Sequence, residues 1–357
     1  MMLSNKQKEI VESKESKVVV NCSAASGKTY TLIERIKYLL NSGINPEKIV
    51  AITFTNAAAE EIKERIGEKG KNCFIGTIHS YCNYLLLCNG IDTSDLIETE
   101  NFDYFFHRFK EHLECKKEID YLLLDEAQDS TYEQFEFLLD MLKPKNWMLF
   151  GDHRQSIYGF NGANPEYLIK LMNDKEVKVY NMNENYRNGS NILSFAKNII
   201  DKVGYNYRDN SISKSNKTGT VMTLSYSING IYNFVSKDDN YKDWFILTRT
   251  NSQLDYIYSY LTNKGIPCST FKRSELSNEQ FNSEMKKNTV KILTIHTSKG
   301  LENKNVIVVG ASAALRRDIE EVRVAYVAAT RAKELLIWMG NRSKPVENKI
   351  KTYNWEK

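Results

Sequence analysis

The chain has 357 residues, enough for two domains of ordinary size, and 41% hydrophobic and 26% charged residues with only 5 prolines exclude a disordered or fibrous protein. Its net charge of +4 permits a polyanionic partner without indicating one. The sequence has no apolar run of about 18 residues, and its start, MMLSNKQKEIVESKES, is polar. We therefore expect no membrane span and no signal peptide, and a cytoplasmic protein.

The first interpretable unit is a strand, a tight loop and a helix. Residues 17–21 (KVVVN) form an apolar strand pattern, and the loop NCSAASG follows over 21–27. Residues 28–41 predict a helix with one apolar face, and Gly43 supplies its stop. Such a unit is typical of a parallel α/β domain.

The same alternation of strand and helix patterns continues along the chain. We predict a first domain over 1–200, with a small helical insert at 81–118, and a second over 201–357, with 201–220 as a polar linker. The fold class is α/β, with one parallel sheet in each domain. Strands are predicted at 49–54, 73–78, 121–124, 147–150 and 177–180, then at 221–225, 244–248, 290–295, 306–309 and 335–339.

The six cysteines lie at irregular spacings without a Cys-x-x-Cys pair, which favours reduced thiols over a zinc site. Four of them fall between positions 73 and 115, so an iron–sulfur cluster stays open as an alternative.

The loop ends in Gly27-Lys28-Thr29, where a strand meets a helix. Backbone N–H groups and a helix N-terminus at that junction suit a phosphate, with Lys28 reaching the β- and γ-phosphates and Thr29 binding magnesium. One glycine and a Lys-Thr pair also fit an ordinary strand–turn–helix. The second motif bears on the choice between this alternative and a nucleotide site.

The second motif is YLLLDEAQD at 121–129, an apolar strand that ends in two adjacent carboxylates. A magnesium-dependent hydrolase needs one carboxylate to hold the metal, here Asp125, and one to orient the attacking water, here Glu126. A solvated acidic turn is the plain alternative. Together with the Lys-Thr loop, the pair predicts hydrolysis of a nucleoside triphosphate.

From this point the sequence resembles the superfamily 1 helicases of the UvrD, Rep and PcrA type. Nine stretches match that family's motifs in the right order over nearly the whole chain: LSNKQ (3–7), FTNAAAE (54–60), GTIH (76–79), LDEAQD (124–129), GDHRQSIYGFNGA (151–163), NYR (185–187), ILTRTN (246–251), TIHTSKGLE (294–302) and YVAATRAK (326–333). The resemblance implies two RecA-like P-loop NTPase domains with Mg-ATP in the cleft between them.

The resemblance also implies a role for each matched residue in ATP binding and hydrolysis. Lys28, Asp125, Glu126, Gln155, Arg187 and Arg331 would act on the phosphates, with Gln155 sensing the γ-phosphate and Arg331 as an arginine finger. Thr29 and Asp125 would hold Mg2+. The other ATP-binding residues would be Gln7, Ser23, Ala24, Ala25, Ser26, Gly27, Tyr30, Tyr186, Gly300 and Glu302, with Tyr186 stacking on adenine and Glu302 taking the ribose hydroxyl.

For single-stranded DNA, the resemblance implies stacking of bases on Phe54 and Phe160. Thr55, Asn56, Thr77, His79 and His296 would contact the strand, several of them through its phosphates. Each phenylalanine could instead be a core residue, and His79 a buried histidine with satisfied hydrogen bonds.

The chain departs from the family in sequence and in length. Ala25 stands where a glycine is usual, Tyr30 where an arginine follows the Lys-Thr pair, and Asn161 where an arginine is usual. The family's large inserted domains, which engage duplex DNA, are reduced to the stretch 79–125 and nearly absent from 251–294.

We therefore expect an ATP-dependent helicase or translocase on single-stranded DNA, by resemblance 3′ to 5′, with forked or tailed duplex as a further substrate and DNA repair as one setting. The alternative is a DNA-stimulated regulatory ATPase that works with a nuclease partner in a Gabija-like antiviral defence system. A nucleotide-binding scaffold without hydrolysis is disfavoured, because every residue expected to act on the phosphates is present.

Overall fold

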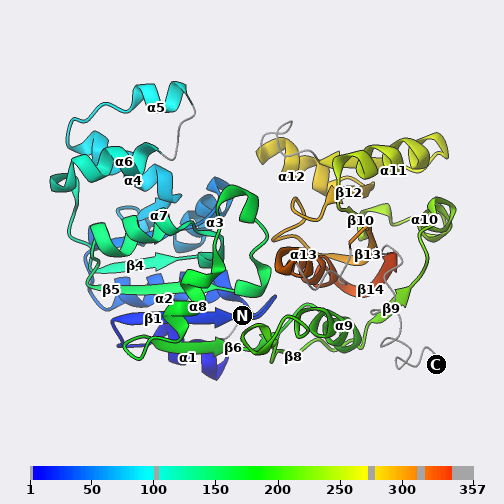
Figure 1. Cartoon of the computed structure of the whole chain (residues 1–357), viewed down its shortest axis with the longest axis horizontal. Helices are drawn as coiled ribbons and strands as arrows, with labels where there is room; N and C mark the ends of the chain where they lie inside the picture. The colour runs from blue at the N-terminus through cyan, green and yellow to red at the C-terminus, as the bar shows by residue number, and fades with distance from the viewer. Residues whose placement is uncertain (1–2, 100–103, 272–277, 312–317, 340–357) are drawn as a thin grey trace. The chain divides into compact units, whose positions relative to one another are not determined.

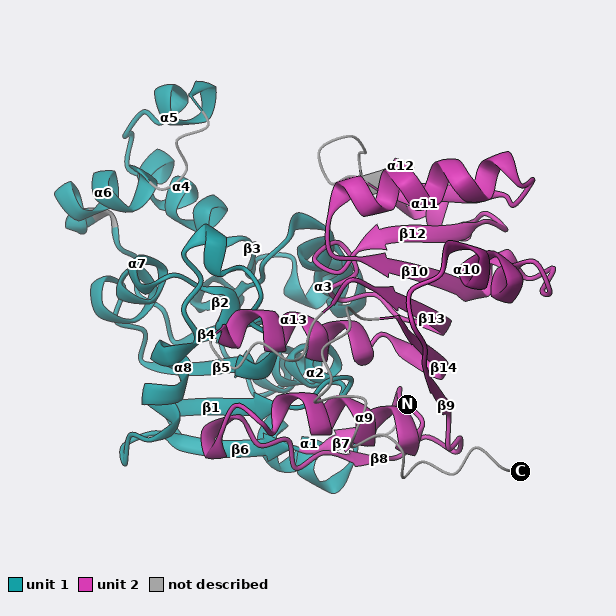
Figure 2. Cartoon of the chain, turned by 45° about the vertical axis from the view of Figure 1, so that its right-hand side comes forward, with its two compact units in different colours: residues 1–182 teal, residues 183–357 magenta. Residues whose placement is uncertain are grey.

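The computed structural model describes residues 3–99, 104–271, 278–311 and 318–339. The chain divides into two compact units, Met1–Met182 (unit 1) and Asn183–Lys357 (unit 2), as Figure 2 shows. The division falls after Met182, whereas the sequence suggested residue 200. The NYR motif at 185–187 therefore belongs to unit 2.

Unit 1 is built on a six-stranded, all-parallel sheet with the order β3-β2-β4-β5-β1-β6. β1 is buried on both faces, because Val19 packs into one hydrophobic cluster while Val18 and Val20 pack into another. Its unbroken apolar run is what a covered parallel strand requires. The strands are β1 (Lys17–Cys22), β2 (Ile49–Ile52), β3 (Phe74–Gly76), β4 (Tyr121–Leu124), β5 (Asn146–Gly151) and β6 (Lys178–Met182).

The helices of unit 1 are α1 (Asn5–Val11), α2 (Lys28–Asn41), α3 (Asn56–Ile66), α4 (Ile78–Cys88), α5 (Ser94–Glu98), α6 (Tyr104–Glu111), α7 (Tyr132–Phe135) and α8 (Pro165–Met172). A π-helical stretch, Glu136–Met141, continues α7. The stretch predicted as a helical insert holds α4, α5 and α6 among its described residues, and they extend away from the sheet (Figure 1). Tyr81, Leu85 and Phe109 of this stretch are buried in the same hydrophobic cluster that receives Val19 of the sheet.

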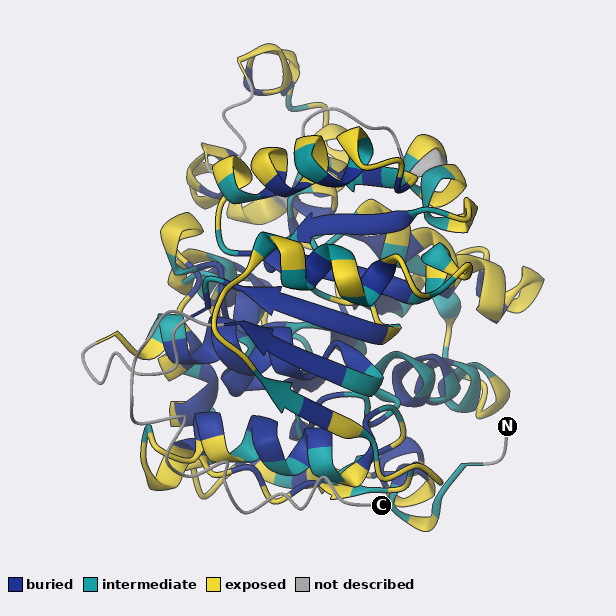
Figure 3. Cartoon of the chain, turned by 90° about the vertical axis from the view of Figure 1, so that its right-hand side faces the viewer, coloured by how far each residue is buried: buried dark blue, intermediate teal, exposed yellow. Residues whose placement is uncertain are grey.

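Unit 2 carries a second all-parallel sheet, in the order β11-β12-β10-β13-β14-β9. Its strands are largely buried, while its helices keep exposed outer faces (Figure 3). The elements are β7 (Glu184–Asn185), α9 (Ser190–Ile200), β8 (Ile212–Ser213), β9 (Thr220–Thr223), α10 (Ile228–Val235), β10 (Trp244–Thr248), α11 (Asn251–Asn263), β11 (Cys268–Phe271), α12 (Asn278–Lys286), β12 (Val290–Thr294), β13 (Asn303–Val309), α13 (Ile319–Ala329) and β14 (Ala332–Met339).

The segment 201–220 is not a linker between the units. It lies within unit 2, where β8 pairs with β7, and Asp209 is buried and accepts a hydrogen bond of 2.9 Å from the Tyr326 hydroxyl. Single polar side chains help to hold this segment in unit 2. Such contacts produce no hydrophobic periodicity from which the sequence could predict them. β11 was also not predicted, because CSTF at 268–271 is a short edge strand of mixed polarity.

Within the part of the chain that the structure describes, no helix combines the length and the apolar character needed to cross a membrane.

Candidate nucleotide-binding site

The predicted phosphate loop lies between β1 and α2. Gly27 caps α2 with a left-handed backbone, φ +81°, and a Cβ at this position would lie 2.8 Å from Gln7 Nε2. Glycine therefore adopts this backbone at the lowest cost, and a larger residue would also displace the Gln7 amide. Gln7, held by a capping box with Ser4 at the start of α1, donates a hydrogen bond of 3.4 Å to the Ser26 carbonyl. The structure thus brings Gln7, a predicted ATP-binding residue, to the loop.

The loop holds a second left-handed residue, Ala25, with φ +56°. The other loop residues are buried: the Ser23 N–H donates to the Met182 carbonyl at 2.9 Å, and Ala24 is enclosed. Ser26 Oγ is buried and has no hydrogen-bond partner among the described residues. A buried hydroxyl without a partner, at the N-terminus of the 14-residue helix α2, fits a phosphate oxygen as its partner.

The two predicted motifs meet in space. Lys28 Nζ lies 3.3 Å from Asp125 Oδ1 and 2.5 Å from Glu126 Oε2, and the Thr29 hydroxyl donates to Asp125 Oδ2 at 3.1 Å. β1 and β4 end at the same edge of the parallel sheet, which is where such sheets bind ligands. Glu126 also takes a left-handed backbone, φ +53°. Backbone strain of this kind gathers at functional sites.

Burial and charge oppose each other in this cluster. Burial raises the pKa of Asp125 above its usual value, against the pull of the Lys28 ammonium. Burial alone would lower the pKa of Lys28, but Asp125 and Glu126 together outweigh it and hold the Lys28 pKa above its usual range. Lys28 is therefore a cation at neutral pH, as a phosphate ligand must be.

Thr29 and Asp125 fit the predicted Mg2+ site. Magnesium keeps several waters and takes few protein ligands beside the phosphate oxygens, so one hydroxyl and one carboxylate suffice. Among the described residues, no three His, Cys, Asp or Glu side chains gather as a metal cluster. Cys73, Cys82 and Cys88 are free thiols, while the side chain of Cys115 lies outside those described.

A network behind Glu126 includes three residues that the sequence analysis did not assign: Gln128, Asp152 and Arg154. Gln128 Nε2 donates to Glu126 Oε2 at 2.6 Å, and Gln128 Oε1 accepts the Asp152 N–H at 2.9 Å. The predicted γ-phosphate sensor Gln155 donates from Nε2 to Asp152 Oδ2 at 2.7 Å. Their positions inside matched motifs were the only signal that could have found them.

Tyr30, the residue that replaces the usual arginine, lies half-buried in the first turn of α2. The Arg65 guanidinium of α3 lies 5.7 Å from its ring centroid. A cation therefore still stands close to this position, although it comes from another helix.

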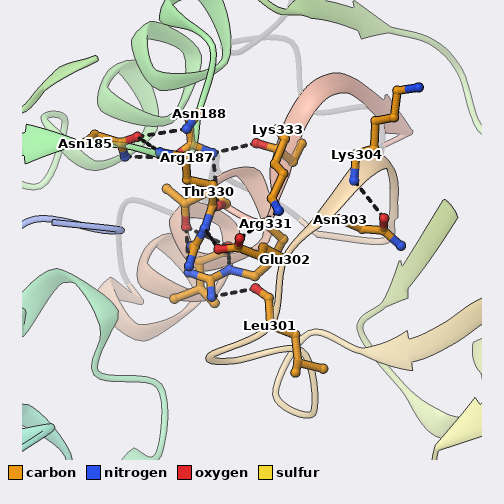
Figure 4. Close-up of polar contacts among 12 residues, drawn as sticks. Asn185, Arg187, Asn188, Leu301, Glu302, Asn303, Lys304, Thr330, Arg331 and Lys333 are labelled. Carbon is orange, nitrogen blue, oxygen red and sulfur yellow. Dashed lines mark hydrogen bonds and ion pairs between the residues drawn. The ribbon is translucent and has the colours of Figure 1, made fainter. Parts of the chain in front are cut away.

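In unit 2 the predicted Arg187, Glu302 and Arg331 form one cluster (Figure 4). Arg187 Nε pairs with Glu302, whose other oxygen lies 2.8 Å from Lys333 Nζ. Burial opposes the Glu302 charge, but Arg187 and Lys333 outweigh burial and hold the pKa of Glu302 below its usual value. Neither arginine is an ordinary surface residue.

Arg331 is buried, and its guanidinium donates to the Val327 carbonyl at 2.9 Å and to the Leu301 carbonyl at 3.1 Å. Asn188, another residue not assigned from the sequence, donates to the carbonyls on either side of Arg331: Thr330 at 3.0 Å and Ala332 at 2.6 Å. The loop that carries Arg187 and the turn that carries Arg331 are thus joined.

The remaining predicted ATP-binding residues of unit 2 are accessible. Tyr186 is exposed, with its hydroxyl donating to Glu184 at 2.7 Å, and Gly300 is exposed with φ +84°. The predicted DNA residue His296 is half-buried in the turn after β12.

In unit 1 the predicted DNA-stacking residues Phe54 and Phe160 are 39% and 69% exposed, so neither is a core residue. The Phe54 ring stacks on Tyr158, 5.2 Å between centroids at 14°, and Tyr158 meets Phe160 edge-on at 6.0 Å. The two expected platforms are joined by a buried tyrosine that the sequence analysis did not assign.

The predicted phosphate contacts of DNA lie at two helix starts. Thr55 caps α3 and Thr77 caps α4, so both also have a structural role, and Asn56 is exposed in the first turn of α3. His79 is half-buried, and its ring packs on Phe106 at 5.2 Å.

Comparison with known proteins identifies the family. The model of the UvrD/REP helicase N-terminal domain matches residues 3–103 and 87–176, and the model of the UvrD-like helicase C-terminal domain matches 270–343. The N-terminal model covers the phosphate loop and the paired carboxylates. The C-terminal model covers Glu302 and Arg331 of the arginine cluster.

Three relatives illustrate the similarity. The chain is 26% identical to the ATP-dependent DNA helicase Rep of Buchnera aphidicola, over 77% of this chain and 58% of that protein. It is 26% identical to a probable DNA helicase of Mycoplasma pneumoniae, over 94% and 82%, and 25% identical to the ATP-dependent DNA helicase PcrA of Staphylococcus epidermidis, over 74% and 50%. The matched region thus spans only about half of the Rep and PcrA relatives. The chain belongs to the UvrD-like helicase family.

Proposed function

We propose that this chain is an ATP-driven motor that moves on single-stranded DNA. The observation that carries the proposal is the meeting of Lys28 and Thr29 with Asp125 and Glu126 at one edge of the unit 1 sheet. A cation for phosphate oxygens, two oxygen ligands for a metal and a carboxylate for water are the parts that phosphoryl transfer to water needs. The names of the relatives, ATP-dependent DNA helicases, agree with this reading.

In unit 1 each side chain has a definite task. Lys28 neutralises phosphate charge, Gln7 reads the adenine edge, and Glu126 orients the attacking water and accepts its proton. Bound Mg2+ would supply charge neutralisation at the phosphates, with Thr29 and Asp125 as its protein ligands. Gln155 senses the γ-phosphate. It lies in the same segment as Tyr158 and Phe160, so it connects that segment to the nucleotide.

Unit 2 contributes to the same reaction. Arg187 and Arg331 stabilise the charge on the transferred phosphoryl group, and Glu302 binds the ribose hydroxyl. Tyr186, whose ring is exposed, stacks on the adenine face. The remaining predicted loop and turn residues, Ser23 to Gly27 and Gly300, approach the nucleotide through their backbones, and Ser26 also through its hydroxyl.

Single-stranded DNA would stack on Phe54 and Phe160, since exposed aromatic rings accept any base. Thr55, Asn56, Thr77, His79 and His296 would contact the strand without reading its sequence. By resemblance to the family, movement is 3′ to 5′.

The small helical insert favours a second candidate, a DNA-stimulated regulatory ATPase that serves a nuclease partner. Among the described residues, the α-helices in the place where the family carries a domain that engages duplex DNA are the short α4, α5 and α6. A motor without that domain can move on one strand and still fail to separate two.

Two substrates distinguish these candidates. Single-stranded DNA should accelerate ATP hydrolysis in both cases, and a forked duplex should be unwound only by a helicase. Displacement of a streptavidin block from a 5′ or 3′ biotinylated strand reports movement and its direction. ATP hydrolysis that does not respond to single-stranded DNA would contradict both candidates.

A further inference from the structure

Arg154 is a buried cation that the proposed chemistry does not use. Its guanidinium lies just beyond β5, with Nε donating to Asp152 Oδ1 at 2.6 Å and Nη2 donating to the Cys22 carbonyl at 2.9 Å. Its side chain is 3% exposed and that of Asp152 is 2% exposed. One planar group therefore joins the segment after β5 to the last residue of β1, where the phosphate loop begins.

The strand register explains why an arginine side chain is needed here. The last pair of the β1–β5 ladder is Asn21 with Gly151, after which β5 ends. Cys22 is one residue further along β1, and its carbonyl receives the Arg154 guanidinium. A buried carbonyl without a donor is costly, and a guanidinium can serve it and a carboxylate at once.

Asp152 has a second partner that gives this contact its functional meaning. Its Oδ1 accepts from Arg154, while its Oδ2 accepts from Gln155 at 2.7 Å. Asp152 N–H also donates to Gln128, which in turn donates to Glu126. One oxygen of the Asp152 carboxylate thus binds Arg154, and the other binds Gln155, the predicted γ-phosphate sensor.

The contacts form a closed circuit around the site. From the Cys22 carbonyl the circuit runs through Arg154, Asp152, Gln128 and Glu126 to Lys28, at the far end of the phosphate loop. Arg154 is the member that ties the start of the loop into the circuit. In its place a neutral or shorter side chain would break the link between Asp152 and the Cys22 carbonyl, so that the start of the loop is no longer held to the segment that carries Gln155.

We propose that Arg154 is a positioning residue for ATP hydrolysis, which sets Gln155 relative to the phosphate loop by binding the Cys22 carbonyl and the Asp152 carboxylate together. The inference rests on the proposed function. It goes beyond it by assigning a function to a residue that touches no substrate and lies outside the set expected to act on ATP.

The first arm of the test is a mutant cycle on turnover. Arg154→Lys keeps the charge but cannot serve both acceptors in a fork, and we expect kcat to fall about 10- to 100-fold with the Kd of a non-hydrolysable ATP analogue little changed. In a Gln155→Ala background the same substitution should change kcat by less than about twofold, because its effect passes through Gln155. Full additivity of the two losses would overturn the proposal.

Two further variants guard against a simple loss of folding. The pair Arg154→Gln with Asp152→Asn removes both charges, so it leaves no unpaired buried ion, and it should fold and show the same turnover defect. Arg35→Lys is the matched control, since Arg35 is another buried arginine of unit 1 that serves a carbonyl, that of Val11, at 2.6 Å. Its kcat should match the wild type. An equal loss of kcat in Arg35→Lys would overturn the assignment.

The second arm does not depend on ATP hydrolysis. Hydrogen exchange in the nucleotide-free protein should show that Arg154→Lys lowers protection of residues 22–29 and 150–157 together, while Arg35→Lys does not. Loss of protection at 150–157 alone would mean that Arg154 does not hold the phosphate loop. If the wild type shows no ATPase activity, the proposed function fails, and this exchange arm still decides whether Arg154 links the two segments.

Discussion

Lys28 Nζ lies 2.5 Å from Glu126 Oε2, and this contact joins the end of the phosphate loop to the carboxylate that follows β4. The two residues are far apart in sequence and come from separate motifs. Their contact means that the nucleotide-binding cation and the proposed water-orienting group share one site, from which the first prediction follows.

Glu126→Gln should stop ATP hydrolysis without preventing ATP binding. The amide keeps the shape of the side chain but cannot accept a proton, so we expect kcat to fall by about 10²- to 10⁴-fold. Lys28 keeps Asp125 as a partner, so the Kd for ATP should change little. Single-turnover hydrolysis and a fluorescent-nucleotide titration measure the two quantities, and Lys28→Ala should differ from Glu126→Gln by weakening ATP binding as well as hydrolysis.

Ala25→Gly should tighten ATP binding. Ala25 has φ +56°, a backbone region that costs an L-residue about 1 kcal/mol or more relative to glycine. Where the empty loop relaxes out of this region, ATP binding must restore it, and a glycine that removes this cost corresponds to roughly a fivefold lower Kd. Ala24→Gly is the matched control, since Ala24 is not among the residues with positive φ. Titration with ATP at fixed Mg2+ compares them. An unchanged or weaker affinity in Ala25→Gly would show that the left-handed alanine does not limit binding.

Phe160→Ala should weaken single-stranded DNA binding by about 1–3 kcal/mol, with no loss of folding stability, because the ring is 69% exposed. Phe54→Ala should act in the same direction and also expose Tyr158, on which it stacks. Tyr132→Ala removes another exposed aromatic ring of unit 1 and serves as the control. Fluorescence anisotropy with labelled oligonucleotides measures the affinities, and equal loss in Tyr132→Ala would contradict a specific platform.

Unit 2 should lose stability on acidification through Glu302. Its pKa lies below the ordinary value of 4.5, because Arg187 and Lys333 outweigh burial. A carboxyl group with a lowered folded-state pKa stabilises the fold above its unfolded-state pKa, and that stability is lost as the pH falls through the lower value. The difference in urea midpoint between wild type and Glu302→Gln should be constant from pH 7 to about pH 5 and shrink below about pH 4.5. A difference that does not vary with pH would contradict the ion pairs.

Local patterns predicted the parts of the fold that local chemistry controls. Tyr121–Leu124 and Trp244–Thr248 are strands with the predicted bounds, because uninterrupted apolar runs have few alternatives in a buried parallel sheet. Lys28, Asp125 and Glu126 could be predicted as candidates from local patterns too, since Asp125 and Glu126 follow directly on β4 and Lys28 begins the helix after the loop that follows β1.

Features that depend on tertiary contacts were missed. The segment 201–220 is held inside unit 2 by the β7–β8 pairing and by polar contacts such as that of the Tyr326 hydroxyl with Asp209, and such contacts leave no hydrophobic period in the sequence. Arg154 lies inside a matched motif and Asn188 directly follows one, and only the structure shows that Arg154 reaches the Cys22 carbonyl and Asn188 the carbonyls beside Arg331. Polar networks of this kind depend on the three-dimensional arrangement of the side chains, which the spacing of residues along the chain does not reveal.

The most direct test of the motor proposal is the rate of ATP hydrolysis by the full chain with and without single-stranded DNA, with Glu126→Gln measured in parallel. The proposal predicts hydrolysis that rises and saturates with single-stranded DNA and that Glu126→Gln abolishes. Wild-type hydrolysis that single-stranded DNA does not change, or that persists in Glu126→Gln, would contradict it.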